Sequence, residues 1–195
     1  MDNRILCVSD NKEKQHTYRM QMIRYKKAIS TGFYLEAIMI DYAMLEDRLL
    51  AFLHHAGIVT RNANKPKISK KSGKELRRLL NCTHIKISNI TTKLAIIEIL
   101  VQLHENQPDK YWVSVQKQIA TTLESEDVLQ ICQAIRKWCD VRNQYVHGLL
   151  NKNYYAVQES WREFAVRGHD LCRDVDRLVD AFKKGNCIRK INNIQ

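Results

Sequence analysis

Three side chains near the end of one helical segment have the types and the spacing needed for phosphoryl chemistry: Arg142, Asn143 and His147. Residues four apart on a helix lie one turn above the other, so Asn143 and His147 share a flank. Arg142 lies on the centre line of the adjacent apolar stripe. A permanent cation, an amide and an imidazole therefore converge where apolar surface meets polar surface. Imidazoles can give or accept a proton near neutral pH, and we interpret the three residues as a candidate catalytic site.

This set of groups suits cleavage of RNA without a metal or other cofactor. The reaction must deprotonate a ribose 2′-hydroxyl, stabilise charge on a five-coordinate phosphorus and protonate the leaving 5′-oxygen. A histidine acting as acid or base contributes about 10²–10⁴-fold, and an arginine fork can bind the non-bridging oxygens. Asn143 would orient the phosphate or His147. The expected products are a 2′,3′-cyclic phosphate and a 5′-hydroxyl, and DNA would be inert because it lacks the attacking group.

A helix that begins near Ser125 must position these residues. Its apolar stripe consists of Val128, Ile131, Ile135, Trp138, Tyr145, Val146 and Leu149. An arginine on such a stripe needs a partner, and Asp41 and Glu46 are the supporting acid candidates that could fix its guanidinium. Both belong to a second helix, expected from Phe33 to Ala56. The alternative is that these acids point to water or pair elsewhere, and that the arginine and the histidine are structural.

The whole chain, residues 1–195, is expected to be one all-α domain, an antiparallel helical bundle. Six glycines and two prolines favour long uninterrupted helices, and 45% hydrophobic residues can supply the core. Apolar periodicity predicts further helices over residues 10–29, 74–80, 90–103, 108–123 and 154–184. Gly185 should end the last helix, and the tail at 186–195 should fray. Gly168 lies on the apolar stripe of that helix, which predicts the close approach of another helix.

A net charge of +11 indicates a polyanionic partner, because clustered cations gain affinity by releasing counterions from phosphates. The most basic stretch starts in an expected loop over residues 58–73 and continues into a short helix, with Glu75 as its only acid. We interpret its cations as candidate RNA-binding residues: Arg61, Lys65, Lys67, Lys70, Lys71, Lys74, Arg77 and Arg78. The alternative is a solvated face that serves only solubility.

The remaining sequence features indicate where in the cell the protein is expected. The first eight residues contain too short an apolar run for a signal peptide, and no segment is apolar enough to span a bilayer. The six cysteines show no paired metal-ligand spacing, and we interpret them as reduced thiols, mostly in the core. We therefore expect a cytoplasmic protein with no membrane partner.

The Arg-Asn-x-x-x-His sequence from Arg142 to His147 resembles the motif of HEPN-domain ribonucleases. These are small all-helical proteins found among toxins, abortive-infection systems and the RNA-cutting domains of type VI CRISPR effectors. The helix over Phe33–Gly57, with its Leu-Glu-x-Arg-Leu sequence, is similar to the early helix of abortive-infection HEPN proteins. HEPN toxins that act with nucleotidyltransferases have a tyrosine two residues after the histidine, where this chain has Leu149. The resemblance therefore favours the abortive-infection branch.

The resemblance covers mainly residues 33–57 and 125–185, and it implies a HEPN-like bundle with extra helices and a composite active site. One chain offers one His147 whereas cleavage has two proton transfers, so a homodimer would supply the second. The implied function is an endoribonuclease toxin of bacterial antiviral defence or a toxin–antitoxin system, restrained by an antitoxin that is an RNA or a small protein. The alternatives are a non-catalytic HEPN module that binds RNA or a partner protein, and a helical scaffold subunit.

Overall fold

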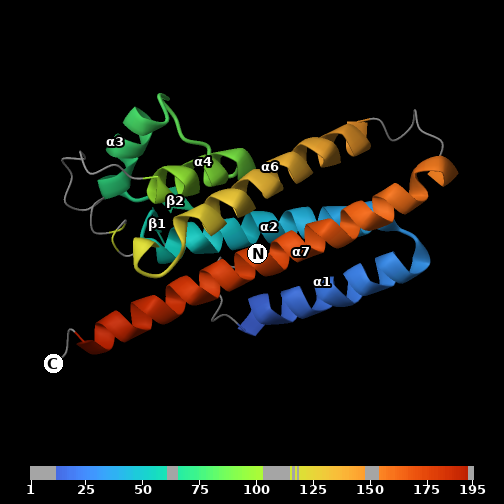
Figure 1. Cartoon of the computed structure of the whole chain (residues 1–195), viewed down its shortest axis with the longest axis horizontal. Helices are drawn as coiled ribbons and strands as arrows, with labels where there is room; N and C mark the ends of the chain where they lie inside the picture. The colour runs from blue at the N-terminus through green and yellow to red at the C-terminus, as the bar shows by residue number, and fades with distance from the viewer. Residues whose placement is uncertain are drawn as a thin grey trace, which may run out of the picture.

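The computed structural model describes residues 12–60, 66–102, 115, 117, 119–147 and 154–192, and these residues are almost entirely helical (Figure 1). The elements in chain order are α1 (Lys12–Thr31), α2 (Tyr34–His55), β1 (Val59–Thr60), β2 (Lys67–Ile68), α3 (Lys70–Leu79), α4 (Ile90–Val101), α6 (Ser125–His147) and α7 (Tyr154–Asn192). The two short strands pair antiparallel, with Val59 opposite Ile68 and Thr60 opposite Lys67. The expectation of an all-α fold is confirmed.

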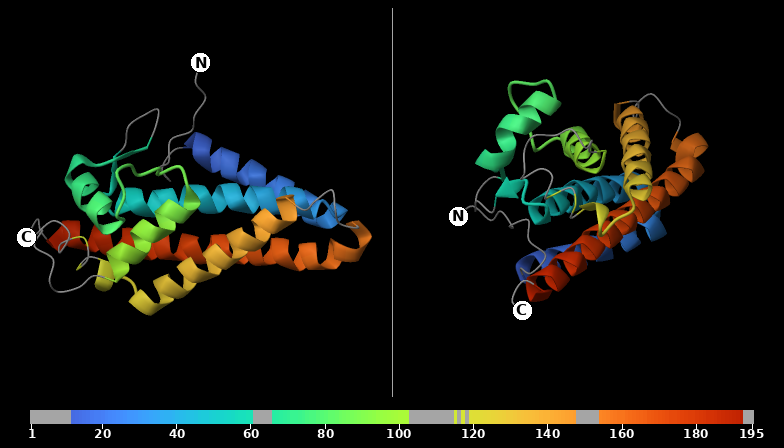
Figure 2. Two further views of the ribbon diagram at one scale, coloured as in Figure 1. Left: turned by 90° about the horizontal axis from the view of Figure 1, so that it is seen from above. Right: turned by 60° about the vertical axis from the view of Figure 1, so that its left-hand side comes forward.

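Helix α2 lies at the centre of the bundle. It packs against α1, α4 and α7, and α6 packs in turn against α4 and α7. Helix α7 runs along the length of the molecule, with α1 on one side of it and α6 on the other (Figures 1 and 2). Opposite sides of α2 are buried: Ile38, Leu45 and Leu49 lie on one side, and Ile40, Met44 and Ala51 lie on the other. A helix that is apolar on more than one side can be stable only inside such a bundle.

The polar side chains of α2 bind the surrounding helices by ion pairs. Three ion pairs join α2 to its neighbours: Asp47 to Lys14 of α1, Glu46 to Lys93 of α4, and Arg48 to Asp176 of α7. Asp41 also lies against His169 of α7, with Oδ1 and Nδ1 3.5 Å apart. Lys93 is 1% exposed, so loss of its carboxylate partner would leave a buried charge without compensation. These pairs fix the register of α2 against its neighbours more than they add net stability.

Gly168 of α7 lies against Trp138 of α6 and Asp41 of α2. A Cβ atom at this position would be 2.5 Å from Cζ2 of Trp138 and 3.1 Å from Oδ2 of Asp41. Both neighbours are buried and cannot move aside easily. The expected close approach of another helix at Gly168 is therefore confirmed.

Most expected helix boundaries agree with the structure to within a few residues. Gly57 follows α2 with φ of 74°, as expected for a glycine that ends a helix. The prediction that Gly185 ends the last helix is wrong, because α7 continues to Asn192; a glycine costs a helix only about 1 kcal/mol. The helix expected over 108–123 falls mostly outside the described residues.

The basic segment differs from the expected loop over 58–73. Residues 59–60 and 67–68 pair as strands, and α3 begins at Lys70 instead of near residue 74. The side chain of Ser69 accepts a hydrogen bond from the backbone N–H of Ser72, which caps the start of α3. The serine cap therefore moves the start of the helix into the basic run.

None of the helices in the described ranges combines the length and the apolar character required to cross a bilayer.

The packing at Gly168 predicts that an added methyl group destabilises the protein at this glycine but not at Gly73. Gly168→Ala should lower the free energy of unfolding by about 1–3 kcal/mol, because the added methyl group overlaps Trp138. Gly73→Ala in α3 is the matched control: its Cβ would be 3.5 Å from Nη1 of Arg77 and 3.8 Å from Cγ2 of Ile68, which are ordinary contacts. The control should gain up to about 1 kcal/mol in helix propensity. Urea denaturation measures both, and equal stabilities of the two variants would contradict the packing.

Candidate active site at the end of helix α6

Aromatic side chains fix the C-terminal half of α6 against α7. The indole Nε1 of Trp138 donates a hydrogen bond to the carbonyl oxygen of Phe164 at 3.0 Å, and the two rings stack with centroids 5.1 Å apart. About two turns later, Tyr145 packs on Phe164 and Trp161 at centroid distances of 4.9 and 5.5 Å. These contacts occupy one side of α6 and set the direction in which residues 142, 143 and 147 project.

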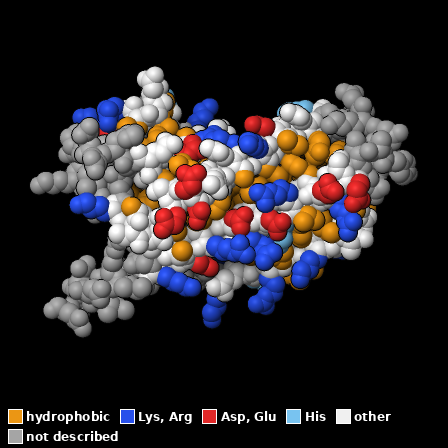
Figure 3. Space-filling view, in the orientation of Figure 1, with side chains coloured by type: hydrophobic (Ala, Val, Ile, Leu, Met, Phe, Trp, Pro, Cys, Tyr) orange, Lys and Arg blue, Asp and Glu red, His pale blue; other side chains and the backbone are white. Residues whose placement is uncertain are grey.

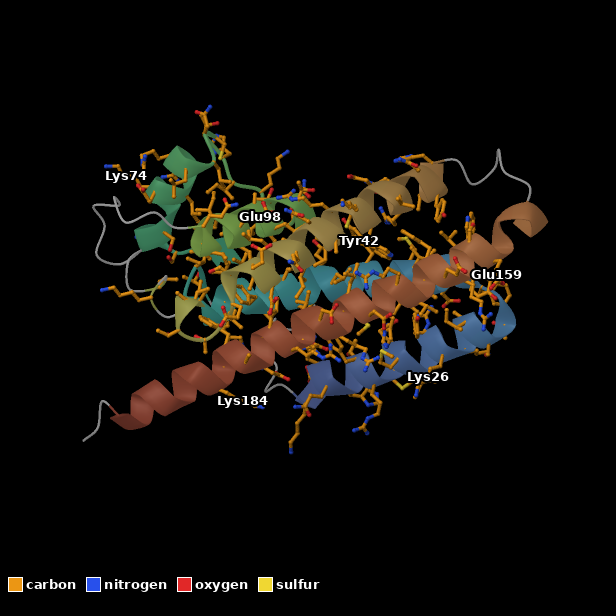
Figure 4. All side chains as sticks on the ribbon, in the orientation of Figure 1. Lys26, Tyr42, Lys74, Glu98, Glu159 and Lys184 are labelled. Carbon is orange, nitrogen blue, oxygen red and sulfur yellow. The ribbon has the colours of Figure 1, made fainter. Side chains whose placement is uncertain are left out.

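Arg142 reaches from α6 to α2 and is half-buried. Its guanidinium carbon lies 4.2 Å from the centroid of the Tyr42 ring, a cation–π contact. Nη1 donates a hydrogen bond to Oδ1 of Asn143 at 2.9 Å, and Nη2 points to the sulfur of Met39 at 3.2 Å. The Nε–H is buried and makes no hydrogen bond within the part of the chain that the structure describes. Figure 4 shows Tyr42 between α2 and α6.

Neither supporting acid candidate contacts Arg142. Asp41 is fully buried, and its Oδ1 lies 3.5 Å from Nδ1 of His169. Glu46 binds Nζ of Lys93 at 2.9 Å. The two carboxylates that the sequence suggested as partners for the arginine are therefore used to join α2 to α7 and to α4.

The lack of a carboxylate distinguishes Arg142 from comparable arginines. Within the described residues, three arginines are half-buried: Arg48, Arg136 and Arg142. Arg48 binds Asp176, and Arg136 binds Glu98 with two hydrogen bonds of 2.9 and 2.7 Å. Arg142 alone of these three has an amide, a thioether and an aromatic ring as neighbours. Its positive charge is therefore not neutralised by any described residue.

Asn143 and His147 are both exposed on α6. Because Oδ1 of Asn143 accepts from Arg142, its amide NH₂ is left to donate to another group. His147 is the last residue of α6, one turn beyond Asn143, and in the described residues no group is within hydrogen-bond distance of its imidazole. The structure thus brings Arg142 and Asn143 into contact and places the histidine at the open end of the same helix.

A second titratable cluster, which the sequence did not reveal, surrounds Asp41. The His169 ring stacks on Tyr25 of α1 with centroids 4.6 Å apart, and the thiol of Cys172 donates to the backbone oxygen of Asp41 at 3.4 Å. Burial raises the pKa of Asp41 to about 6, although the nearby His169 offsets part of this effect. The only sequence signal was the position of His169 next to Gly168.

Other catalytic chemistries find little support in the described residues. No group of three histidine, cysteine or acidic side chains there could hold a metal ion. Cys132, Cys139 and Cys172 are buried free thiols, and burial raises the pKa of Cys139 to about 11. A protonated thiol is a poor nucleophile, so these cysteines act as core residues.

The candidate RNA-binding residues lie far from Arg142. Among them, Lys67, Lys70, Lys74, Arg77 and Arg78 are exposed on β2 and α3. Figure 4 shows Lys74 at one end of the molecule, opposite the C-terminal end of α6, and Figure 3 shows basic side chains over the same end. Arg61, Lys65 and the side chain of Lys71 fall outside the described residues. The basic surface and the candidate catalytic residues are therefore separate regions.

Comparison with known proteins finds no matching family model, no matching curated protein and no matching solved structure.

The buried carboxyl of Asp41 predicts a pH-dependent stability. Since its pKa is raised from about 4 in an unfolded chain to about 6, its contribution is fully present below about pH 4 and is lost as the pH rises through 6. This loss amounts to roughly 3 kcal/mol. Asp41→Asn removes the titration. Urea denaturation between about pH 4 and 7 should show a smaller decline for the variant than for the wild type; parallel curves would refute the assignment.

Proposed function

We propose that this protein is a metal-independent endoribonuclease. The observation that carries the proposal is Arg142, a half-buried guanidinium with no carboxylate partner among the described residues, hydrogen-bonded to Asn143. A cation in such surroundings has unused capacity to bind an anion. His147, exposed at the end of the same helix, supplies a group that can transfer protons beside that anion. The order of these residues also resembles the HEPN ribonuclease motif.

In the proposed reaction, each residue acts on one part of the phosphodiester. Arg142 binds the non-bridging oxygens, and its contact with the Tyr42 ring keeps the guanidinium in one orientation before the substrate arrives. Asn143 donates its free NH₂ to a phosphate oxygen. His147 removes the proton of the 2′-hydroxyl, whose oxygen attacks the phosphorus, and the P–O5′ bond breaks. The products are a 2′,3′-cyclic phosphate and a 5′-hydroxyl.

The second proton transfer, to the 5′-oxygen, requires another acid. A second copy of the chain would supply it through its own His147. This requires a two-fold axis that places the C-terminal end of each α6 helix against the side of the other α6 helix. Met39, which touches Arg142, is 43% exposed, and Figure 3 shows hydrophobic side chains at the surface around the C-terminal half of α6. A homodimer would cover this apolar surface.

The HEPN resemblance extends the proposal to a biological setting. A cytoplasmic nuclease of this type would act as a toxin in bacterial antiviral defence or in a toxin–antitoxin system, and an RNA or small-protein antitoxin would restrain it. The net charge of +11 suits an RNA as substrate or as antitoxin.

A second candidate function is a non-catalytic module that binds RNA or protein. The observation that favours it is that Tyr42, Met39 and Asn143 hold Arg142 within its own chain. Under this reading the arginine joins α6 to α2, and its removal would lower stability without affecting any chemistry.

Cleavage of labelled RNA in EDTA tests the proposed reaction. His147→Ala should lower the rate by about 10²–10⁴-fold through loss of the proton-transfer group, and Arg142→Ala by about 10²–10³-fold through loss of charge stabilisation. Lys137→Ala is the matched control, an exposed cation on the same helix, and should cleave as the wild type does. The 3′ product should carry no free 5′-phosphate.

Two results separate the candidate functions. Equal cleavage by the wild type and both site variants would assign the activity to another site or a contaminant. No cleavage by the wild type, together with a lower melting temperature for Arg142→Ala alone, would support the non-catalytic module.

Light scattering at micromolar concentration tests the dimer. The expected mass is about twice the 22.9 kDa of one chain, because the proposed site needs a second imidazole. A mass of one chain in a preparation that cleaves RNA would refute the composite site while leaving the assignment of Arg142 intact.

A further inference from the structure

A polar pocket lies beside α3, away from the candidate active site. It is enclosed by β2, by the Gly73–Arg77 side of α3 and by the segment over residues 83–87, and its volume is about 320 Å³. Gly73 is buried and has no side chain, so the Arg77 guanidinium can lie across it, with Nη1 3.5 Å from the position of a Cβ. The floor of the pocket is therefore backbone, and an arginine forms one wall.

The charged side chains among the described residues that line this pocket are both positive. Lys67 and Arg77 line it together with the imidazole of His84 and the hydroxyl of Thr83, and none of these lining residues is acidic. Neither Lys67 nor Arg77 has an ion-pair partner in the described residues. The only acid between residues 66 and 87 is Glu75, which does not line the pocket and binds Arg78. No acid of this segment therefore offsets the positive potential of the pocket.

We propose that this pocket binds a phosphate group of an RNA strand and anchors the strand at a distance from the site of cleavage. Two long cationic side chains and a hydroxyl are donors of the kind that bind phosphate oxygens. The apolar walls formed by Ile68 and Ile85 suit the ribose or base that accompanies the phosphate. The proposal rests on the proposed function in one respect: RNA is the substrate.

The position of the pocket restricts the substrate class. Helix α3 lies at the end of the molecule opposite the C-terminal end of α6 (Figures 1 and 2), and Arg142 lies in the last two turns of α6. A strand that occupies both regions must be a polynucleotide. Dinucleotides and very short oligomers cannot reach from one region to the other.

Fluorescence anisotropy with a labelled RNA of about 16 nucleotides, methylated at every 2′-oxygen so that it cannot be cleaved, tests the anchor. Arg77→Ala and Lys67→Ala should each weaken binding by about tenfold and reduce the slope of log K against log salt by about 0.7. Lys86→Ala is the matched control, an exposed cation in the neighbouring segment that does not line the pocket. It should bind RNA as the wild type does. A labelled trinucleotide should bind weakly to all four proteins.

Three outcomes would overturn the anchor: an equal loss for Arg77→Ala and Lys86→Ala, no loss for Arg77→Ala, or saturation of the pocket by inorganic phosphate or 5′-AMP that leaves RNA binding unchanged. Circular dichroism melting confirms that the variants are folded. RNA binding that depends on Arg77 in a protein that cleaves no RNA would refute the proposed nuclease and leave the anchor standing. Cleavage that depends on Arg142 but not on Arg77 would refute the anchor and leave the proposed nuclease standing.

Discussion

The contact of Gly168 with Trp138 and Asp41 is the constraint on which the rest of the structure depends. It sets the distance between α7 and both of its neighbours, and it holds the Trp138 ring between α6 and α7. Arg142 is one turn beyond Trp138 on α6, so this packing also directs the guanidinium toward α2. On α2, Asp41 and Tyr42 are consecutive and project about 100° apart. The carboxylate therefore faces α7, and the aromatic ring faces Arg142.

Ion pairs on α2 then select this arrangement among others with similar apolar burial. An ion pair buried between helices gains little net stability, because desolvation offsets most of the attraction. Breaking one is nevertheless costly, since the remaining charge has no solvent around it. Lys93 is a clear case: it is 1% exposed and has Glu46 as its carboxylate partner. A rotation or slip of α2 would separate this pair, so the helix has one favourable register.

The sequence predicted the helices well because apolar periodicity is a local property. It could not decide where the charges of α2 would go: Asp41 and Glu46 lie on opposite margins of one stripe, and their partners, His169 and Lys93, come from helices more than 45 residues away in the chain. The contact of Arg142 with Tyr42 was missed for the same reason. The extension of α7 past Gly185 was missed because a single glycine weakens a helix without ending it. Sequence reasoning thus identified the candidate residues and not their partners.

The strongest physical reason to propose a function at Arg142 comes from comparing which half-buried arginines have a carboxylate partner. The other two half-buried arginines in the described residues, Arg48 and Arg136, each have a carboxylate beside the guanidinium. Two acids, Asp41 and Glu46, are close to Tyr42 in sequence. Asp41 contacts His169 of α7 instead, and Glu46 pairs with Lys93 of α4. The result is a cation that is desolvated on one side, oriented by an aromatic ring and without a carboxylate partner among the described residues. A carboxylate beside the guanidinium would weaken its attraction for the charge that develops on a phosphate during cleavage, because like charges repel. The surroundings of Arg142 in the described part of the chain therefore suit the proposed cleavage.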